Sequence, residues 1–122
     1  MRARNELVGA GDWQRPLDDN VVARAAEVLR LLADATRLRL LALLAEGPQD
    51  VNTLAAKVDA SRSSVSQHLG RLRWSGLVTA RREGRRMIYR LSSDHVRGLV
   101  AEAYAFAEHL DRESPITARM PE

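Results

Sequence analysis

Two short helical patterns are joined by only three residues, and this spacing constrains the fold more than any other feature of the sequence. Apolar residues recur at helical spacing on both sides of Asp59-Ala60-Ser61. Asp50 or Asn52 can start the helix before this connection and Ser61 can cap the helix after it, because side-chain oxygens accept hydrogen bonds from the free N–H groups of a first turn. Two helices across so short a connection predict a helix-turn-helix unit.

Two further helices are expected before this unit. Apolar residues at three- and four-residue spacing place one stripe on a helix from residue 21 to about residue 33, with its cap formed by Asp18, Asp19 or Asn20. Asp34 can cap a second, leucine-dense helix, which Gly47-Pro48 ends. So many leucines predict that this second helix is largely buried.

After Ser75-Gly76 the pattern changes to a period close to two. Residues 77–82 and 85–91 flank Glu83-Gly84, and this arrangement predicts a two-stranded hairpin. Ser92 or Ser93 can then cap a long amphipathic helix that reaches about Leu110. The expected fold is mainly α with a small β-hairpin, in the order α-α-α-α-β-β-α.

A chain of 122 residues fits one small domain. We expect this domain at residues 20–110, with flexible tails at residues 1–19 and 111–122. The apolar stripes of the first and last helices are too large for so small a core to cover, which predicts a homodimer through these two helices. The expected interface residues are Val21, Val22, Ala25, Val28, Leu29, Val96, Leu99, Val100, Ala103, Phe106 and Leu110.

The basic residues are concentrated in one part of the chain. Between residues 61 and 90, eight arginines stand against one glutamate, a local net charge of +7, although the whole chain carries only +3. A basic block on an otherwise acidic chain is typical of nucleic-acid-binding proteins. A solvated arginine-rich surface without a partner is the alternative.

Several function classes are excluded by what the sequence lacks. There is no cysteine, which excludes a disulfide framework, a thiol nucleophile and a thiolate metal site. The chain shows neither a signal peptide nor a run of about 18 apolar residues, so we expect a cytoplasmic protein with no membrane partner. It also lacks a glycine-rich phosphate loop and a histidine–carboxylate group at catalytic spacing, so we do not expect an enzyme.

Three strings in consistent order resemble the ArsR/SmtB family of bacterial winged helix-turn-helix repressors. They are L-A-D-A-T-R-L-R-L-L at residues 32–41, S-S-V-S-Q-H-L-x-x-L at 63–72 and G-R-R-M-I-Y-R-L at 84–91. The resemblance covers about residues 25–110. The last helix, with D-H-V-R-x-L-V at residues 94–100 and A-E-H at 107–109, is similar to the actinobacterial nickel- and cobalt-responsive branch.

The resemblance implies a dimeric regulator, by family default a repressor, that binds double-stranded operator DNA. One helix would enter the major groove, where the amide of Gln67 suits a bidentate contact to adenine. For His68 the family pattern favours DNA contact, and a surface histidine without a role is the alternative. Alternation along the strands allows about two of the four hairpin arginines to reach DNA. The expected DNA-binding residues are Arg62, Ser63, Ser64, Gln67, His68, Arg71, Arg81, Arg82, Arg85 and Arg86.

The resemblance also implies a metal site, for nickel, cobalt or zinc, at His95, Glu108 and His109. The two histidines lie roughly 21 Å apart along one helix, so the site requires the antiparallel helix of a partner subunit. Ser93 and Phe106 stand where the family pattern has an acid and a histidine, and the C-terminal tail lacks the branch's histidines. Capping positions at the helix ends are the alternative for His95 and His109. The alternative function is a metal-independent DNA binder, constitutive or acting with a separate co-regulator protein.

Overall fold

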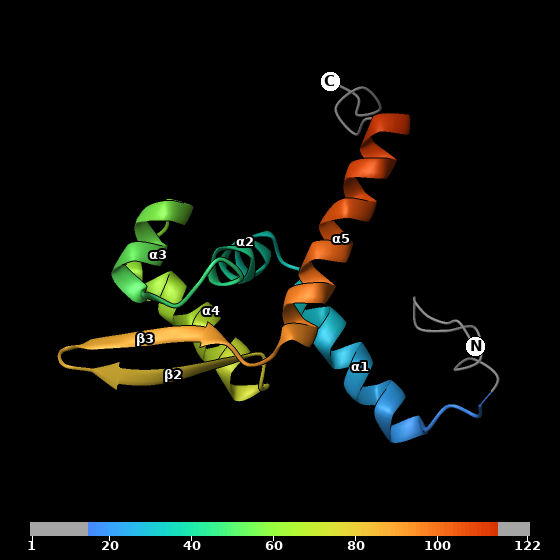
Figure 1. The fold of residues 1–122 in the computed structure, drawn as a ribbon, viewed down its shortest axis with the longest axis horizontal. Coiled ribbons are helices and arrows are strands. Elements are labelled where there is room, and N and C mark those ends of the chain that lie inside the picture. Colours follow the sequence, from blue (N-terminus) through green and yellow to red (C-terminus); the bar gives the residue numbers. More distant parts are fainter. Residues whose placement is uncertain (1–14, 115–122) are drawn as a thin grey trace. The chain divides into compact units, whose positions relative to one another are not determined.

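The structure, a computed structural model, describes residues 15–114 of the chain (Figure 1). The chain divides into two compact units, residues 1–30 and residues 31–122. Helix α1 (Asp19–Leu32) begins in the first unit. Asp18 caps it, because its Oδ1 accepts the backbone N–H groups of Asn20 at 2.8 Å and Val21 at 3.2 Å.

The second unit has the predicted order of elements, with one additional strand. In chain order these are α2 (Ala35–Leu44), β1 (Gln49–Asp50), α3 (Val51–Val58), α4 (Arg62–Trp74), β2 (Val78–Glu83), β3 (Arg86–Leu91) and α5 (Asp94–Glu113). Each helix starts after a polar side chain that accepts a backbone N–H group of the first turn, and these caps are Asp34, Asp50, Ser61 and Ser93. The expected caps Asp34 and Ser61 are therefore confirmed, and of the two candidates for each of the other helices, Asp50 and Ser93 form the cap.

The predicted two-stranded hairpin is part of a three-stranded antiparallel sheet in the order β1-β3-β2, so that prediction was incomplete. In the added strand, Gln49 lies opposite Tyr89 and Asp50 lies opposite Ile88. A strand of two residues has no alternating pattern, which is why the sequence did not reveal it. The turn of the hairpin was predicted correctly: Gly84 has a φ of 65°, which suits the first loop position of a two-residue turn.

The core of the second unit lies where α2, α3 and α4 pack together against the base of the hairpin. The largest fully buried side chains are Leu40, Leu41, Leu44, Leu54, Leu69, Leu72, Val65 and Val78. Three of them belong to α2, so its predicted burial is confirmed. Among the described residues, no helix has the length and apolar character needed to span a membrane.

The hairpin and α5 extend away from this core in different directions, so that the hairpin turn and the C-terminal end of α5 lie far apart (Figure 1). Helix α5 continues to Glu113, beyond the predicted end at Leu110. In its last turn, His109 Nε2 lies 3.6 Å from Glu113 Oε2, one helical turn further along. Every side chain from Ala101 to Glu113 is exposed.

Candidate nucleic-acid interface

Helix α4 turns one side to the core and the other to solvent. Val65, Leu69 and Leu72 are fully buried, as their spacing predicted. Ser64 is half-buried at the start of the helix, and its N–H donates to Ser61 Oγ at 3.0 Å. The solvent side carries four of the predicted DNA-binding residues, all exposed: Arg62, Ser63, Gln67 and Arg71.

His68 differs from these exposed residues. Its side chain is 23% exposed, and its Nδ1 lies 3.4 Å from Nη1 of Arg37 and 4.0 Å from Oδ2 of Asp34. Because a guanidinium only donates hydrogen bonds, Nδ1 accepts in the contact with Arg37. The imidazole therefore connects α4 with the beginning of α2, a contact that the sequence did not predict.

The beginning of α2 is held by a buried cation and an anionic cap. Arg37 is only 9% exposed, and its Nε donates to the carbonyl of Leu31 at 2.7 Å. The hydrogen bond from the backbone N–H of Arg37 lowers the pKa of Asp34, and the nearby positive charge of Arg37 lowers it further. Asp34 and Arg37 thus fix the part of α2 that His68 contacts.

Alternation along the hairpin divides its arginines into two groups. Oε2 of Glu83 lies 3.3 Å from Nη2 of Arg81 and 3.9 Å from Nη2 of Arg90. Arg86, opposite Glu83 in the sheet, donates from Nε to Oδ2 of Asp50 at 2.7 Å. Arg81 and Arg86, two of the four predicted hairpin contacts, therefore have acidic partners within the chain.

Arg82 and Arg85 form the second group. Arg82 lies opposite Met87 in the sheet, and Arg85 follows Gly84 in the turn. Both side chains are exposed. In the part of the chain that the structure describes, neither has an acidic side chain within ion-pair distance. Their positive charges are the ones that the hairpin leaves unneutralised.

Asp50 joins three elements. It belongs to β1, it caps α3 by accepting the N–H of Thr53 at 2.8 Å, and it pairs with Arg86 at the start of β3. Hydrogen bonds from the backbone and side chain of Thr53, followed by that from Arg86, lower its pKa to about 2. The carboxylate is therefore charged at neutral pH and holds the hairpin against α3. The sequence predicted the cap, but the ion pair follows from a sheet register that it did not reveal.

The three predicted metal ligands lie on α5 and do not meet within one chain. His95 is exposed in the first turn, Glu108 lines a cavity against α2, and His109 contacts Glu113. The described residues contain no group of three or more His, Cys, Asp or Glu side chains placed to hold a metal ion. Imidazole and carboxylate are suitable donors for nickel, cobalt or zinc. These residues therefore fit a metal ion only if a second chain completes the site.

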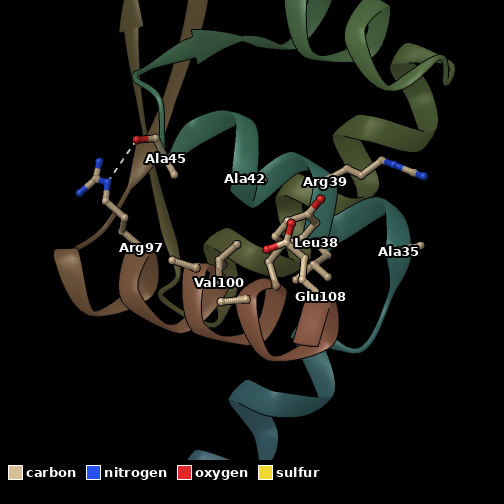
Figure 2. Close-up of a pocket in the computed structure, with 11 residues that line it drawn as sticks. Ala35, Leu38, Arg39, Ala42, Ala45, Arg97, Val100 and Glu108 are labelled. Atoms are coloured by element: carbon tan, nitrogen blue, oxygen red, sulfur yellow. Dashed lines mark hydrogen bonds between the residues drawn. The ribbon is translucent and has the colours of Figure 1, made fainter. Parts of the chain in front are cut away.

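The cavity beside Glu108 has a volume of about 630 Å³ and lies between α2 and α5 (Figure 2). Its lining is mostly apolar, and Figure 2 shows Leu38 of α2 next to Glu108. Arg39 points away from it, and Arg97 turns aside to donate from Nε to the carbonyl of Ala45 at 3.1 Å. The cavity is thus an apolar groove with one carboxylate near its edge.

Two predicted dimer-interface residues belong to the core instead. Val96 and Val100 are buried within their own chain, where α5 packs against α2 and β3, so their assignment to the interface was wrong. The remaining predicted residues of α5 are exposed, namely Leu99, Ala103, Phe106 and Leu110. On α1, Val28 is half-buried and the others are exposed, namely Val21, Val22, Ala25 and Leu29.

Comparison with known sequences finds a family and close relatives. The family model described as "Bacterial regulatory protein, arsR family" matches residues 34–80, which run from the cap of α2 into β2. The HTH-type transcriptional regulator KmtR of Mycobacterium tuberculosis is 49% identical over 77% of this chain and 72% of its own length. The HTH-type transcriptional regulator NmtR of the same organism is 41% identical over 78% of this chain and 79% of its own length.

A solved structure has the same fold. It is the NMR structure of a homodimeric winged helix-turn-helix DNA-binding domain from Mycobacterium bovis, described as a possible ArsR-family transcriptional regulator. It aligns with a TM-score of 0.71 and 36% identity, covering 77% of this chain and 88% of that chain. The predicted winged helix-turn-helix architecture is thereby confirmed.

Proposed function

From the premise that the chain belongs to the arsR family of bacterial regulatory proteins, we propose that it represses genes as a homodimer that binds operator DNA through α4 and the hairpin. The chain is thus a DNA-binding transcriptional regulator rather than an enzyme. One observation carries this proposal. The exposed polar side of α4 lies on the same unit as a hairpin that leaves Arg82 and Arg85 without acidic partners. Such a regulator acts on the bacterial chromosome and therefore in the cytoplasm.

In this proposal α4 is the recognition helix. Ser63 and Gln67 reach base edges in the major groove, and the amide of Gln67 is suited to bind adenine in a bidentate way. Arg62 and Arg71 bind phosphates on either side of them. His68 acts as a positioning residue, because its contact with Arg37 fixes α4 against α2.

The hairpin contributes Arg82 and Arg85 to the phosphates or to the minor groove, whose negative potential attracts guanidinium groups. Arg81 and Arg86 have a different role. Their ion pairs with Glu83 and Asp50 stabilise the hairpin. The same ion pairs neutralise the positive charges that contacts to DNA phosphates would require. The predicted set of four hairpin contacts is therefore reduced to two.

The dimer forms through residues that are exposed in the single chain. On α5 these are Leu99, Ala103, Phe106 and Leu110, and we assign the apolar stripe of α1 to the same role. Residues 20–110 then form the DNA-binding and dimerisation domain. The relative in the M. bovis structure is homodimeric. A twofold dimer presents two copies of α4 to half-sites about one DNA turn apart.

A metal ion supplies the signal in this proposal. Nickel, cobalt or zinc would bind His95 of one protomer together with Glu108 and His109 of its partner, which gives two symmetric sites per dimer. Held by these residues, such an ion would supply a positive charge shared by the two α5 helices. Coupling of about 1–3 kcal/mol between this site and DNA would suffice for regulation.

The DNA contacts are tested by the salt dependence of binding to a duplex taken from upstream of the protein's own gene. Arg85→Ala and Arg82→Ala should each lower the slope of log affinity against log salt by about 1 per half-site. Arg81→Ala is the matched control, since Arg81 lies in the same hairpin but is paired with Glu83. Equal salt slopes for Arg81→Ala and Arg85→Ala would refute the division of the hairpin arginines into those with acidic partners and those that contact DNA. A wild-type protein that binds no duplex at low ionic strength would refute the function.

The metal site is tested by titrating nickel, cobalt and zinc into the metal-free protein while its affinity for the same duplex is measured. At least one ion should change that affinity by about fivefold or more, and His95→Ala should abolish the change. If no ion binds more tightly than micromolar, the protein is a metal-independent regulator, acting constitutively or with a co-regulator protein.

A further inference from the structure

Trp74, the last residue of α4, is 92% exposed, more than any other large apolar side chain described. Indole is the largest side chain, and structures usually bury most of its apolar surface. The residue four positions earlier is Gly70, which has no side chain to pack on the indole and has open space around it. The ring therefore has little apolar cover from its own chain, and a partner of the right shape would gain by covering it.

The phase of the helix places Trp74 in line with the proposed DNA-reading residues. At 3.6 residues per turn, positions 63, 67, 70 and 74 form one row along the helix. This row runs opposite Val65, Leu69 and Leu72, which point into the core. Trp74 thus lies on the side of α4 that carries Ser63 and Gln67.

The length of the row places the indole at the border of the groove. Ser63 and Trp74 are separated by about 16 Å along the helix axis at a rise of about 1.5 Å per residue. The major groove of B-DNA is only about 12 Å wide. If α4 enters the groove at an angle with Ser63 and Gln67 over base edges, its C-terminal end leaves the groove and Trp74 lies beside the sugar–phosphate strand that borders it.

We infer that Trp74 is a further DNA-contacting residue, which packs its ring against deoxyribose and donates its indole N–H to a phosphate oxygen at the border of the groove. The indole Nε1–H is a donor and has no acceptor lone pair, which matches a phosphate. Arg71 and Arg73 flank it and are both exposed, so the surroundings favour an anionic partner. This inference rests on the proposed binding of DNA by α4.

Fluorescence provides the first test, because the sequence holds only two tryptophans. In a Trp13→Phe protein, emission excited at the red edge of the indole band comes from Trp74 alone. Titration with an unlabelled duplex from upstream of the gene should change this emission and protect the indole from quenching by acrylamide. Unchanged emission and quenching at saturating duplex would overturn the inference.

Affinity provides the second test. Trp74→Ala should weaken duplex binding about tenfold, and Trp74→Phe, which keeps a ring but lacks the N–H, about threefold. Neither substitution should alter the salt slope, because indole is uncharged. Tyr104→Ala is the matched control, since it removes an exposed aromatic ring from α5 and should leave the affinity unchanged.

These outcomes separate the inference from the function on which it rests. If the wild-type protein binds the duplex and Arg85→Ala weakens it, but Trp74→Ala does not, the inference is wrong and the function stands. If no variant and no wild-type protein binds the duplex, the function itself is wrong. If Trp74→Ala changes the oligomeric state in sedimentation, the indole covers a second copy of the chain and the inference is overturned.

Discussion

Helices α4 and α5 are both amphipathic in sequence, yet the chain covers the apolar side of only one of them. In α4, Val65, Leu69 and Leu72 are completely buried. In α5, Val96 and Val100 are buried near the start, but Phe106 remains 61% and Leu110 51% exposed. The apolar stripe of α4 is thus buried within the chain, whereas the apolar stripe of α5 continues beyond the core and stays exposed.

In the proposed function, this difference gives the two helices different tasks. A helix packed on its own core holds its outer side chains in fixed positions, which is what reading base edges requires. A helix with an uncovered apolar side gains stability from a second copy, so its environment depends on assembly. A signal that acts on the α5 pair can then change the spacing of the two recognition helices without altering either one.

The largest effect is expected inside α4. Leu69→Ala removes a fully buried side chain and should lower the free energy of unfolding by about 3 kcal/mol, since the packed neighbours cannot close the cavity. Chemical denaturation of the variant and the wild type measures the difference. Leu110→Ala on α5, which also shortens a leucine, is the control. The stability that it loses should depend on protein concentration, because Leu110 is covered only in the proposed dimer. A concentration-independent loss of similar size for both variants would contradict the contrast between the helices.

The next effect concerns assembly. Phe106→Asp places a charge in the proposed contact between two α5 helices, so it should weaken dimerisation about a hundredfold or more. The helical content should stay nearly the same because Phe106 is exposed in the single chain. Sedimentation equilibrium gives the dimer dissociation constant and circular dichroism the helical content. Glu102→Asp, a conservative change on the same helix, should leave the dimer intact. A dimer that tolerates Phe106→Asp would show that α5 does not form the interface.

The features that sequence predicted well are local. Each helix start depends on one oxygen-bearing side chain and the backbone two or three residues away, so Asp34 and Ser61 could be identified without knowledge of the fold, and Asp50 could be named as one of two candidates. The buried side of α4 also follows from spacing alone. Gly84 marks the hairpin turn for the same reason, because a positive φ favours glycine.

The features that sequence missed depend on contacts between distant segments. Asp50 and Arg86 are 36 residues apart, and only the pairing of β1 with β3 brings them together. The contact between Arg37 and His68 depends on how α2 packs against α4. For this reason the sequence could count the hairpin arginines but could not separate Arg82 and Arg85 from those with acidic partners.

A smaller effect is expected at Asp50, whose carboxylate joins β1, the start of α3 and β3. Asp50→Ala removes the cap of α3 and the partner of Arg86, and it should cost about 1 kcal/mol of stability at neutral pH. The folded pKa of Asp50 is lowered from 3.8 to about 2. The carboxylate therefore stabilises the fold above about pH 4, and this contribution disappears as the pH falls toward 2. Denaturation at pH 6 and pH 2.5 should show the difference between wild type and variant shrinking. Glu46→Ala, which removes an exposed carboxylate that pairs with no cation of the described residues, serves as the control.

The smallest effect compares one histidine from each helix. His68→Ala removes the acceptor for Nη1 of Arg37, but the buried guanidinium keeps its bond to the carbonyl of Leu31, so the loss of stability should be only about 0.5–1 kcal/mol. His95→Ala, at an exposed position on α5, should leave the stability of the metal-free protein unchanged within about 0.5 kcal/mol. The order reverses for regulation, because His68→Ala should keep the metal response and His95→Ala should abolish it. Denaturation and metal-dependent DNA binding of the two variants measure both quantities. If His68→Ala alone abolished the metal response, the signal would act through α4, and the separation of tasks between the two helices would have to be abandoned.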